Sequence, residues 1–280
     1  MLKPSSKAEK EFQELRLASW HTGQRVRARG LLGYPEPNSQ DKQFIAAFER
    51  LLSSNPGVGF LLETPFTPVA IKTRVTDKEG GRMAYYLCCG DYLQHQLDSI
   101  FAHVRPGDRC LEAGGGIGVT AAAMGAASGQ PVIAYEPNPN LERPFWDTMQ
   151  LNNIQATLHK EAIVGIAAPG ETQYLHITPE YWWSSLRERQ EYTEALPVPV
   201  VGLVDVLDKY KPDVFFSDSE LAEQLHVSRP LNHRPRTAFI EIHTPELGPQ
   251  ETCRIAQWWI DQGYKLTDLR AYLWTFERKY

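Results

Sequence analysis

Hydrophobic and polar positions alternate with helical spacing along the first part of the chain. Residues 7–17 form a charged amphipathic stretch, and residues 41–52 carry an apolar stripe that predicts a second helix. Residues 30–40, rich in Gly, Pro, Asn and Ser, predict a loop between them. A third helical stretch covers residues 91–104, with Asp91 placed to cap its first turn. The first two of these stretches predict a helical lead-in over residues 1–58.

Apolar and polar residues alternate instead over residues 69–75, and a second apolar run covers residues 83–89. Residues 78–81, Lys-Glu-Gly-Gly, have the composition of a turn. Two such runs joined by a glycine turn predict a β-hairpin. On its return strand, the adjacent Cys88 and Cys89 would point to opposite faces.

From residue 108 onward, short apolar runs alternate with helical stretches. This alternation predicts an α/β fold with a doubly wound, Rossmann-like sheet that is mostly parallel and has an antiparallel C-terminal edge. The predicted strands are residues 109–113, 132–135, 157–164, 213–217, 238–242, 265–269 and 272–276, and the predicted helices are residues 118–127, 141–152 and 249–262. We expect residues 91–280 to form this domain and residues 1–90 to form an N-terminal helical and β-hairpin extension.

The alternation is interrupted between residues 171 and 201, where aromatic side chains gather. They are Tyr174, Tyr181, Trp182, Trp183 and Tyr192. We interpret the segment as an insertion near the mouth of a ligand site, because aromatic faces line sites for sugars and flat ligands. Core packing of the insertion is an equally good interpretation of the same residues.

Composition and charge narrow the class of protein. The 280 residues are 42% hydrophobic and carry a formal net charge of −5, and no apolar run approaches the ~20 residues of a membrane span. The mild acidity disfavours a broad nucleic-acid surface. The four cysteines, Cys88, Cys89, Cys110 and Cys253, lack CxxC spacing and are interpreted as reduced thiols. We expect a cytoplasmic protein with neither nucleic acid nor a membrane as partner.

The strongest chemical signal is residues 111–118, Leu-Glu-Ala-Gly-Gly-Gly-Ile-Gly, between a predicted strand and a predicted helix. Glycines permit a sharp turn and the close approach of a ligand, and a helix N-terminus offers free N–H groups. Glu136 ends the next strand, about twenty residues after Gly116, where an acidic side chain binds ribose hydroxyls in such folds. A tight strand–helix turn without a ligand is the alternative interpretation.

Two cofactor assignments are considered for this loop. The NAD fingerprint G-x-G-x-x-G requires a third glycine where this chain has Val119. Glu112, two residues before the first glycine, would repel a pyrophosphate but suits the sulfonium and ammonium charges of S-adenosylmethionine (SAM). The electrostatics therefore favours SAM over a dinucleotide.

Residues 82–243 together resemble the FkbM-type class I SAM-dependent methyltransferases. At the cofactor end, residues 111–118 are similar to the family's D-V-G-A-N-I-G, and YEPNPN at 135–140 is similar to its F-E-P-N-P. The other similar segments are residues 85–97, 152–153, 161–165, 198–207, 216–223 and 240–243. The chain departs from the family pattern at Glu112, Gly115, Gly116, Ser217 and Leu221.

The resemblance implies a class I methyltransferase sheet, SAM as cofactor, and O-methylation of a hydroxyl on a small-molecule acceptor, a sugar or a secondary metabolite. The residues it places around SAM are Glu112, Gly114, Gly116 and Gly118 at the methionine part, Glu136 at the ribose with Asn138 in the same segment, and Glu161 and Ala162 beside the adenine. All fall at the carboxyl ends of predicted strands, where doubly wound folds bind ligands. The extension is expected to cover the site or to mediate dimerisation, so a homodimer is among the expected assemblies.

Acidic and imidazole side chains that follow the later strands are candidates for chemistry. Asp218, Glu241 and His243 are the expected catalytic residues, because methylation of a hydroxyl needs a base and an aligned acceptor. Asp218 is equally well placed to cap the next helix, and a lone His is often structural. Asp218, Glu220 and Glu241 are weaker candidates for ligands of a divalent cation such as Mg²⁺.

We therefore expect a SAM-dependent methyltransferase, with two alternatives. An NAD-dependent oxidoreductase would bind NAD and not SAM. A degenerate, non-catalytic SAM-fold module would bind SAM without turnover, an option that Ser217 and Leu221 leave open. Methylation of a nitrogen in nucleic acid or protein is disfavoured, because the chain lacks the N/D-P-P-Y/F signature.

Overall fold

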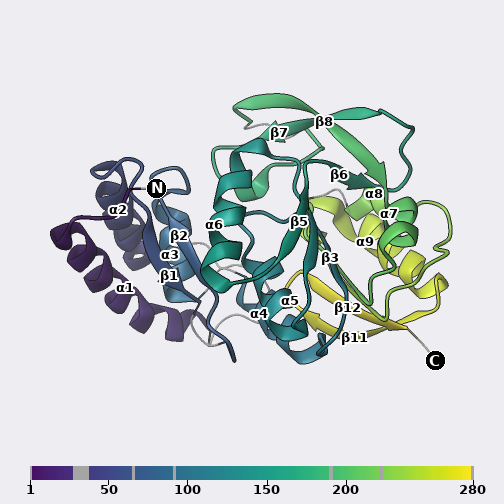
Figure 1. Ribbon diagram of the computed structural model, residues 1–280, viewed down its shortest axis with the longest axis horizontal. Helices are drawn as coiled ribbons and strands as arrows, with labels where there is room; N and C mark the ends of the chain where they lie inside the picture. Colours follow the sequence, from purple (N-terminus) through teal and green to yellow (C-terminus); the bar gives the residue numbers. More distant parts are fainter. Residues whose placement is uncertain are drawn as a thin grey trace. The chain divides into compact units, whose positions relative to one another are not determined.

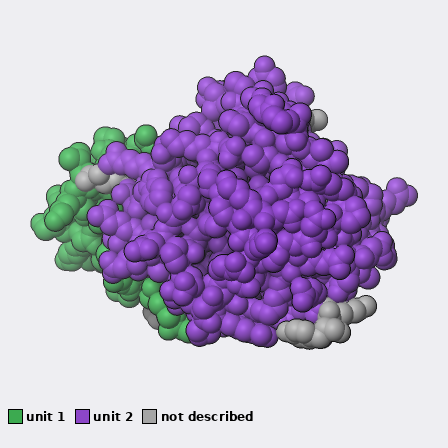
Figure 2. Space-filling model, turned by 45° about the vertical axis from the view of Figure 1, so that its right-hand side comes forward, with its two compact units in different colours: residues 1–98 green, residues 99–280 purple. Residues whose placement is uncertain are grey.

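The computed structural model describes residues 2–27, 38–64, 67–90, 93–188, 192–220 and 223–278 (Figure 1). The side chains of residues 20–27, 225 and 226 lie outside this description, as do the predicted cap Asp91, most of the predicted loop at 30–40, and Leu221. The chain divides into two compact units, Met1–Asp98 and Ser99–Tyr280, which have different colours in Figure 2. The boundary falls within helix α4 (Gln94–His103). This helix confirms the third helix predicted from the sequence.

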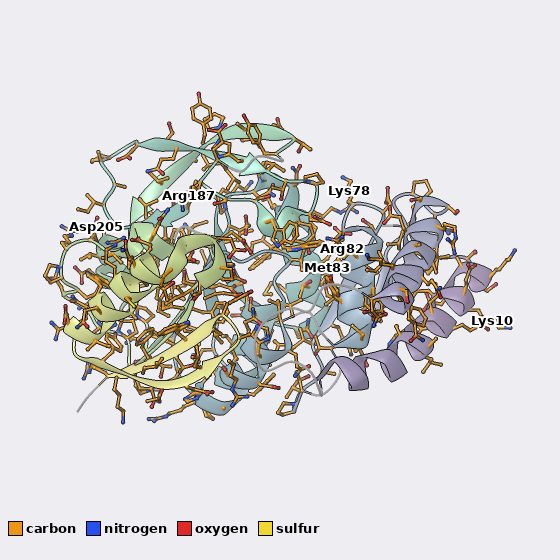
Figure 3. The ribbon with its side chains drawn as sticks, turned by 180° about the vertical axis from the view of Figure 1, so that it is seen from behind. Lys10, Lys78, Arg82, Met83, Arg187 and Asp205 are labelled. Carbon is orange, nitrogen blue, oxygen red and sulfur yellow. The ribbon has the colours of Figure 1, made fainter. Side chains whose placement is uncertain are left out.

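Unit 1 contains the two helices predicted first from the sequence. They are α1 (Ser6–Arg27) and α2 (Ser39–Ser53). The side chain of Asn38 accepts a hydrogen bond from the Asp41 amide, and the Asp41 carboxylate accepts one from the Asn38 amide, so a capping box fixes the start of α2. Lys10, labelled in Figure 3, projects from α1 with its side chain 78% exposed, as the amphipathic pattern predicts.

A two-stranded antiparallel sheet completes unit 1. It pairs β1 (Phe60–Glu63) with β2 (Lys72–Val75). Three buried rings, Phe12, Phe48 and Phe60, pack together: Phe12 stacks on Phe60 at 4.6 Å between centroids and meets Phe48 edge-on at 5.6 Å. The unit therefore has an aromatic core of its own.

The predicted β-hairpin is wrong, because its return strand is a helix. Residues 83–89 lie in α3 (Gly80–Cys89), and β2 pairs with β1 instead. A short continuous apolar run fits a buried helix as well as a strand, and Met83, labelled in Figure 3, is fully buried. Cys88 and Cys89 are both buried on α3, so they do not alternate across a sheet.

The glycines that indicated a hairpin turn allow two helices to touch. The Gly81 amide donates to Glu49 Oε2 at 2.6 Å, and a Cβ at Gly81 would lie only 2.5 Å from the Glu49 backbone nitrogen. Any larger residue would separate the start of α3 from α2. Glycine at position 81 allows the two helix backbones to approach closely. The composition of residues 78–81 alone does not distinguish this role from that of a hairpin turn.

Unit 2 is built on a seven-stranded sheet that confirms the predicted fold class. The strand order is β11-β12-β10-β9-β3-β4-β5. Its strands are β3 (Cys110–Ala113), β4 (Val132–Tyr135), β5 (Ala156–His159), β9 (Val214–Ser217), β10 (Thr237–Glu241), β11 (Tyr264–Arg270) and β12 (Leu273–Arg278). Neighbouring strands from β5 to β10 are parallel, and β12 runs antiparallel to both β10 and β11. The result is a doubly wound, Rossmann-like sheet with an antiparallel C-terminal edge.

Helices connect the parallel strands and place the ligand crevice. They are α5 (Val119–Ser128), the 3₁₀ turn η1 (Pro139–Leu141), α6 (Glu142–Asn152), α7 (Leu203–Tyr210), α8 (Glu223–His226) and α9 (Thr244–Asp261), which is kinked at Gly248. The chain runs from β3 to β4 and β5 on one side, and later to β9 and β10 on the other. This reversal at β3 and β9 is a topological switch point, where doubly wound sheets bind ligands beyond the carboxyl ends of their strands.

A separate three-stranded sheet accounts for the interrupted segment. Strands β6 (Ala162–Val164), β8 (Glu194–Gly202) and β7 (Thr172–Ile177) pair in that order, and the 3₁₀ turn η2 (Tyr181–Trp183) follows β7. The single strand predicted at 157–164 is therefore wrong. It is two strands, because the chain leaves the large sheet after β5 and enters the small one at β6, seen at the top of Figure 1.

The aromatic residues of the small sheet divide between core and surface. Tyr181 is buried, whereas Tyr174, Trp183 and Tyr192 are 61%, 44% and 40% exposed. Against the large sheet, Trp259 of α9 is buried beside Phe215 of β9 and Phe276 of β12, with its ring nearly parallel to both. Within the described residues, no helix is long and apolar enough to cross a membrane.

Candidate functional site

The glycine-rich loop leaves β3 and enters α5 with three glycines in the left-handed region. Gly114, Gly116 and Gly118 have φ angles of 88°, 52° and 86°, which residues with a Cβ rarely adopt. The amides of Gly114 and Gly115 both donate to the Tyr135 carbonyl of β4, at 2.9 and 3.1 Å. The loop is thus fixed against the neighbouring strand at the switch point.

The space around the loop differs from glycine to glycine. A Cβ at Gly114 would lie 1.7 Å from the carbonyl oxygen of Asp218, so this position packs directly against the chain beyond β9. A Cβ at Gly116 would meet nothing within 4 Å. The open side of the loop at Gly116 leaves room for a ligand to reach the backbone.

Glu136, at the end of β4, turns its carboxylate to this open side. Its Oε2 accepts a hydrogen bond from the Gly116 amide at 2.8 Å, and its Oε1 accepts one from the Asn138 amide at 2.7 Å. Burial raises the pKa of Glu136 from 4.5 to about 7, against the opposing effect of these two amides. A buried carboxylate in contact with the glycine loop is suited to accept hydrogen bonds from ligand hydroxyls.

Glu112, on β3 directly below the loop, is completely buried. Its Oε1 accepts a hydrogen bond from the Thr120 hydroxyl, and its Oε2 has no hydrogen-bond partner among the described residues. Burial raises the pKa of Glu112 from 4.5 to about 8, and the charge of Glu136 adds to the shift. Below about pH 8 Glu112 is therefore protonated in the unliganded protein, and a positive charge at the loop would favour its ionised form.

The other predicted cofactor residues lie along the same edge. Asn138 is buried, and its Oδ1 accepts from the Asn140 amide at 3.0 Å. Glu161 lies between β5 and β6, with Oε2 at 3.8 Å from His159 Nδ1, and Ala162 begins β6 and is buried. No contact between Glu161 or Ala162 and the glycine loop is among those found in the described residues.

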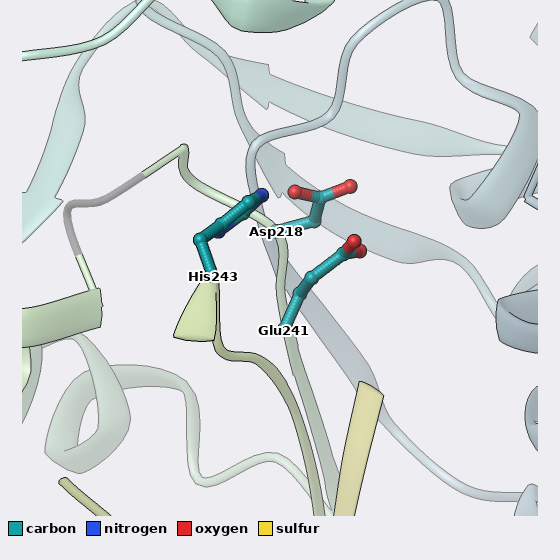
Figure 4. Close-up of side chains that lie close together, drawn as sticks. All are labelled: Asp218, Glu241 and His243. Carbon is teal, nitrogen blue, oxygen red and sulfur yellow. The ribbon is translucent and has the colours of Figure 1, made fainter. Parts of the chain in front are cut away.

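Three predicted catalytic residues come together beyond β9 and β10. One ligand atom each from Asp218, Glu241 and His243 lies within 4.8 Å of the others, and Figure 4 shows the carboxylates of Asp218 and Glu241 side by side with the His243 ring facing Asp218. At that separation two like charges repel by about 3 kcal/mol at an effective dielectric constant near 20. Burial, followed by Glu241 and Glu220, raises the pKa of Asp218 well above its usual range.

The alternative role of Asp218 as a helix cap does not fit its position. The next helix, α8, begins at Glu223, five residues later. The Asp218 amide donates to the Ala113 carbonyl at 3.0 Å, which continues the pairing of β9 with β3 past the strand ends. Asp218 Oδ1 is buried and lacks a hydrogen-bond partner among the described residues.

His243 is held between two carboxylates. Its Nδ1 and its backbone amide both lie 2.9 Å from Oε1 of Glu223, and its Nε2 lies 3.4 Å from Oε1 of Glu220. Burial lowers the pKa of His243, but Glu220 and Glu223 outweigh that effect and raise it well above the usual value. The ring orientation is therefore set by Glu223, with Nε2 turned toward the acidic residues.

Sequence reasoning missed two residues that shape this cluster. Glu223, whose side chain is fully buried, lies three residues after Glu220 in the segment 216–223, and only this spacing hinted at a shared role. Ser185, in the loop after η2, donates its hydroxyl to the Glu220 carbonyl. Glu220 has a φ of 46°, an unusual conformation for a residue with a side chain, and Ser185 helps to hold it.

The set that can hold a metal differs from the sequence expectation. Asp218, Glu220 and Glu241 were the expected ligands, whereas the atoms that converge belong to Asp218, Glu241 and His243. Glu220 faces the same imidazole from 3.4 Å and lies at the edge of the group.

Comparison with known proteins gives fold-level similarity only. No family model and no curated protein matches the sequence. Similar solved structures include a precorrin-6y C5,15-methyltransferase from Geobacter metallireducens (10% identity, 66% of this chain and 89% of that chain, TM-score 0.39). Others are fibrillarin from Aeropyrum pernix with natively bound S-adenosyl-L-methionine (12%, 62% and 67%, TM-score 0.34) and a SAM-dependent O-methyltransferase from Thermotoga maritima (11%, 66% and 64%, TM-score 0.36).

The strand order and the position of the glycine loop define the class of domain. Unit 2 is a doubly wound, Rossmann-like domain with the sheet expected of a class I methyltransferase. At such low identities and TM-scores, this assignment rests on the geometry of the chain itself.

Proposed function

We propose that the chain is a SAM-dependent methyltransferase that methylates a hydroxyl oxygen. The observation that carries the proposal is the pair of buried carboxylates at the glycine loop, Glu112 beneath it and Glu136 bonded to its Gly116 amide. A cationic sulfonium would favour ionisation of both carboxylates, whereas the pyrophosphate of NAD would oppose it. Val119, in place of a third glycine, also disfavours NAD.

The residues at the loop fit SAM in its separate parts. Glu136 would accept hydrogen bonds from the ribose hydroxyls, and the open side of Gly116 would receive the methionine part above Glu112. Glu161 and Ala162 remain candidates for the adenine, on the resemblance of their segment. When bound, SAM supplies a methyl group already activated by its sulfonium.

The acceptor end is proposed to lie at Asp218, Glu241 and His243. Asp218 Oδ1, buried and without a hydrogen-bond partner among the described residues, is free to accept the proton of an acceptor hydroxyl. The raised pKa of Asp218 makes its carboxylate a stronger base than a solvent-exposed one. His243, fixed by Glu223, would orient the acceptor or stabilise its oxygen.

The acceptor is proposed to be a sugar or a secondary metabolite. The exposed aromatic rings of Tyr174 on β7, Trp183 in η2 and Tyr192 before β8 support a ligand with flat or apolar faces. The Ser185 hydroxyl connects this segment to the Glu220 carbonyl at the cluster. A cytoplasmic location, a homodimer and the lack of a nucleic-acid partner stay predictions.

The test is calorimetric titration of the full chain with S-adenosylhomocysteine, with NAD as the control. Micromolar binding of S-adenosylhomocysteine and none of NAD is the expected result. Binding of NAD alone would replace the proposal with an oxidoreductase. Binding of S-adenosylhomocysteine by a chain that transfers no methyl group to any hydroxyl acceptor would indicate a non-catalytic module.

A further inference from the structure

The side chains at the acceptor end have the composition of a cation site as well as that of a base. Two carboxylates, the half-buried Asp218 and the buried Glu241, share a space with the buried imidazole of His243, and their ligand atoms lie within 4.8 Å of one another. Figure 4 shows all three side chains directed into that space, Asp218 from the end of β9 and Glu241 and His243 from the end of β10. Carboxylate oxygens suit cations such as Mg²⁺ and Mn²⁺, and imidazole nitrogen binds first-row transition metals.

A second observation is the unsatisfied oxygen of Asp218. Its Oδ1 is fully buried, lacks a hydrogen-bond partner among the described residues, and belongs to a carboxylate that lies between Glu241 and His243. Buried polar atoms in folded proteins are nearly always paired, and one without a partner calls for a bound ion or water. The position of this oxygen points to an ion in the shared space.

A third observation is the way His243 is held. Its Nδ1 lies 2.9 Å from Oε1 of Glu223, a residue whose side chain is completely buried. Histidines that bind a metal through one nitrogen commonly donate the other N–H to a carboxylate, which fixes the tautomer and the ring plane. Glu223 thus leaves His243 Nε2 turned toward the carboxylates, as a metal ligand requires.

The spacing of Glu220 agrees with the same arrangement. Its Oε1 lies 3.4 Å from His243 Nε2, longer than a strong N–H···O hydrogen bond. Two ligands at neighbouring positions around a cation, each about 2.1 Å from it, are about 3.0 Å apart. A small contraction would bring Glu220 into contact with the same ion.

We infer that Asp218, Glu241 and His243 bind one divalent cation of the Mg²⁺ or Mn²⁺ class, and that Glu223 is a positioning residue for His243. Three protein ligands leave coordination positions open, where the acceptor hydroxyl binds and ionises more readily. Asp218 is then a metal ligand instead of the base. This inference rests on the proposed function for its role in methyl transfer, but binding of the cation does not require SAM.

The experiment measures binding of Mn²⁺ to the full chain by electron paramagnetic resonance, without SAM, with Mg²⁺ as competitor. We expect one site per chain that Mg²⁺ displaces. Asp218→Asn and Glu241→Gln should each weaken Mn²⁺ binding more than tenfold. Glu223→Gln should weaken it about 10- to 100-fold although it removes no ligand, and Glu223→Asp should restore part of the affinity.

Asp261→Asn is the matched control, because Asp261 is an exposed carboxylate at the end of α9. It should leave Mn²⁺ affinity unchanged. Circular dichroism and thermal melting identify any variant that fails to fold, and His243→Gln then serves as the second ligand variant. Absence of Mn²⁺ binding, or binding that Asp218→Asn and Asp261→Asn leave equally strong, would overturn the inference. Titration of the same protein with S-adenosylhomocysteine tests the proposed function separately, so that either can fail alone.

Discussion

Replacing Glu112 by Gln should stabilise the unliganded protein in alkaline solution while weakening its affinity for SAM. The folded-state pKa of Glu112 is about 8, against 4.5 for the free side chain. Between these two values the folded chain retains a proton that the unfolded chain has lost. Unfolding therefore releases a proton, and the free energy of unfolding falls as the pH rises from about 4.5 to 8. Glutamine has no charge to bury and removes this dependence.

The magnitude follows from the size of the shift. Each pKa unit corresponds to about 1.4 kcal/mol, so a shift from 4.5 to about 8 corresponds to at most about 5 kcal/mol above pH 8. We expect about 2–4 kcal/mol, because the ionised side chain keeps its bond from Thr120 and gains some hydration. At pH 5, where Glu112 is protonated in the folded state, the two proteins should differ little.

Urea unfolding followed by tryptophan fluorescence at pH 5 and pH 8.5 is the assay. Six of the seven tryptophans lie in unit 2, so the signal reports the unit that contains Glu112. Calorimetry then compares SAM with S-adenosylhomocysteine, which lacks the sulfonium charge, and Glu112→Gln should weaken SAM binding more. Equal stability of wild type and variant at pH 8.5, or an equal loss of affinity for both ligands, would refute the role assigned to this carboxylate.

Four further substitutions test other parts of the site. Glu136→Ala should weaken binding of S-adenosylhomocysteine by about 1–3 kcal/mol in calorimetry, through loss of the ribose hydrogen bonds, and unchanged affinity would contradict that role. Gly114→Ala should lower the melting temperature strongly, since its Cβ would lie 1.7 Å from the Asp218 carbonyl oxygen. Gly116→Ala, whose Cβ would meet nothing within 4 Å, should lower the free energy of unfolding by only about 1–2 kcal/mol because of its positive φ. Similar losses of stability in the two variants would argue against the packing described. Asp218→Asn should reduce methyl transfer far more than affinity for S-adenosylhomocysteine in paired assays, and parallel losses would indicate a structural residue.

The large sheet could be predicted from the sequence because its signals are local. The strands at 110–113 and 132–135, with glycines at the turn, give alternating elements whose order leaves little choice of fold. The error at residues 83–89 has a different origin. The apolar run fits a strand or a helix, and the helix observed is held at its start by the Gly81–Glu49 hydrogen bond, a contact across 32 residues that no local pattern contains.

The candidate site likewise combines residues that local sequence patterns predict with residues whose role depends on contacts distant in the sequence. Asp218, Glu241 and His243 could be predicted as neighbours because parallel strands end at one edge of the sheet. The role of Glu223 could not, since it depends on how α8 returns its side chain to His243. The split between β5 and β6 was also hidden, because two apolar runs separated by Lys160 and Glu161 read as one strand when the second sheet is unknown.

The contact between Gly114 and the Asp218 carbonyl has a consequence for how ligands enter and leave. Together with the hydrogen bond from the Asp218 amide to the Ala113 carbonyl, it holds the glycine loop against the Asp218 segment. The crevice cannot widen by parting these two segments without breaking strand pairing. Product release and substrate binding must then depend on movement of other segments. Where product release limits turnover, substitutions in those surrounding segments should affect turnover before substitutions in the glycine loop or the Asp218 segment do.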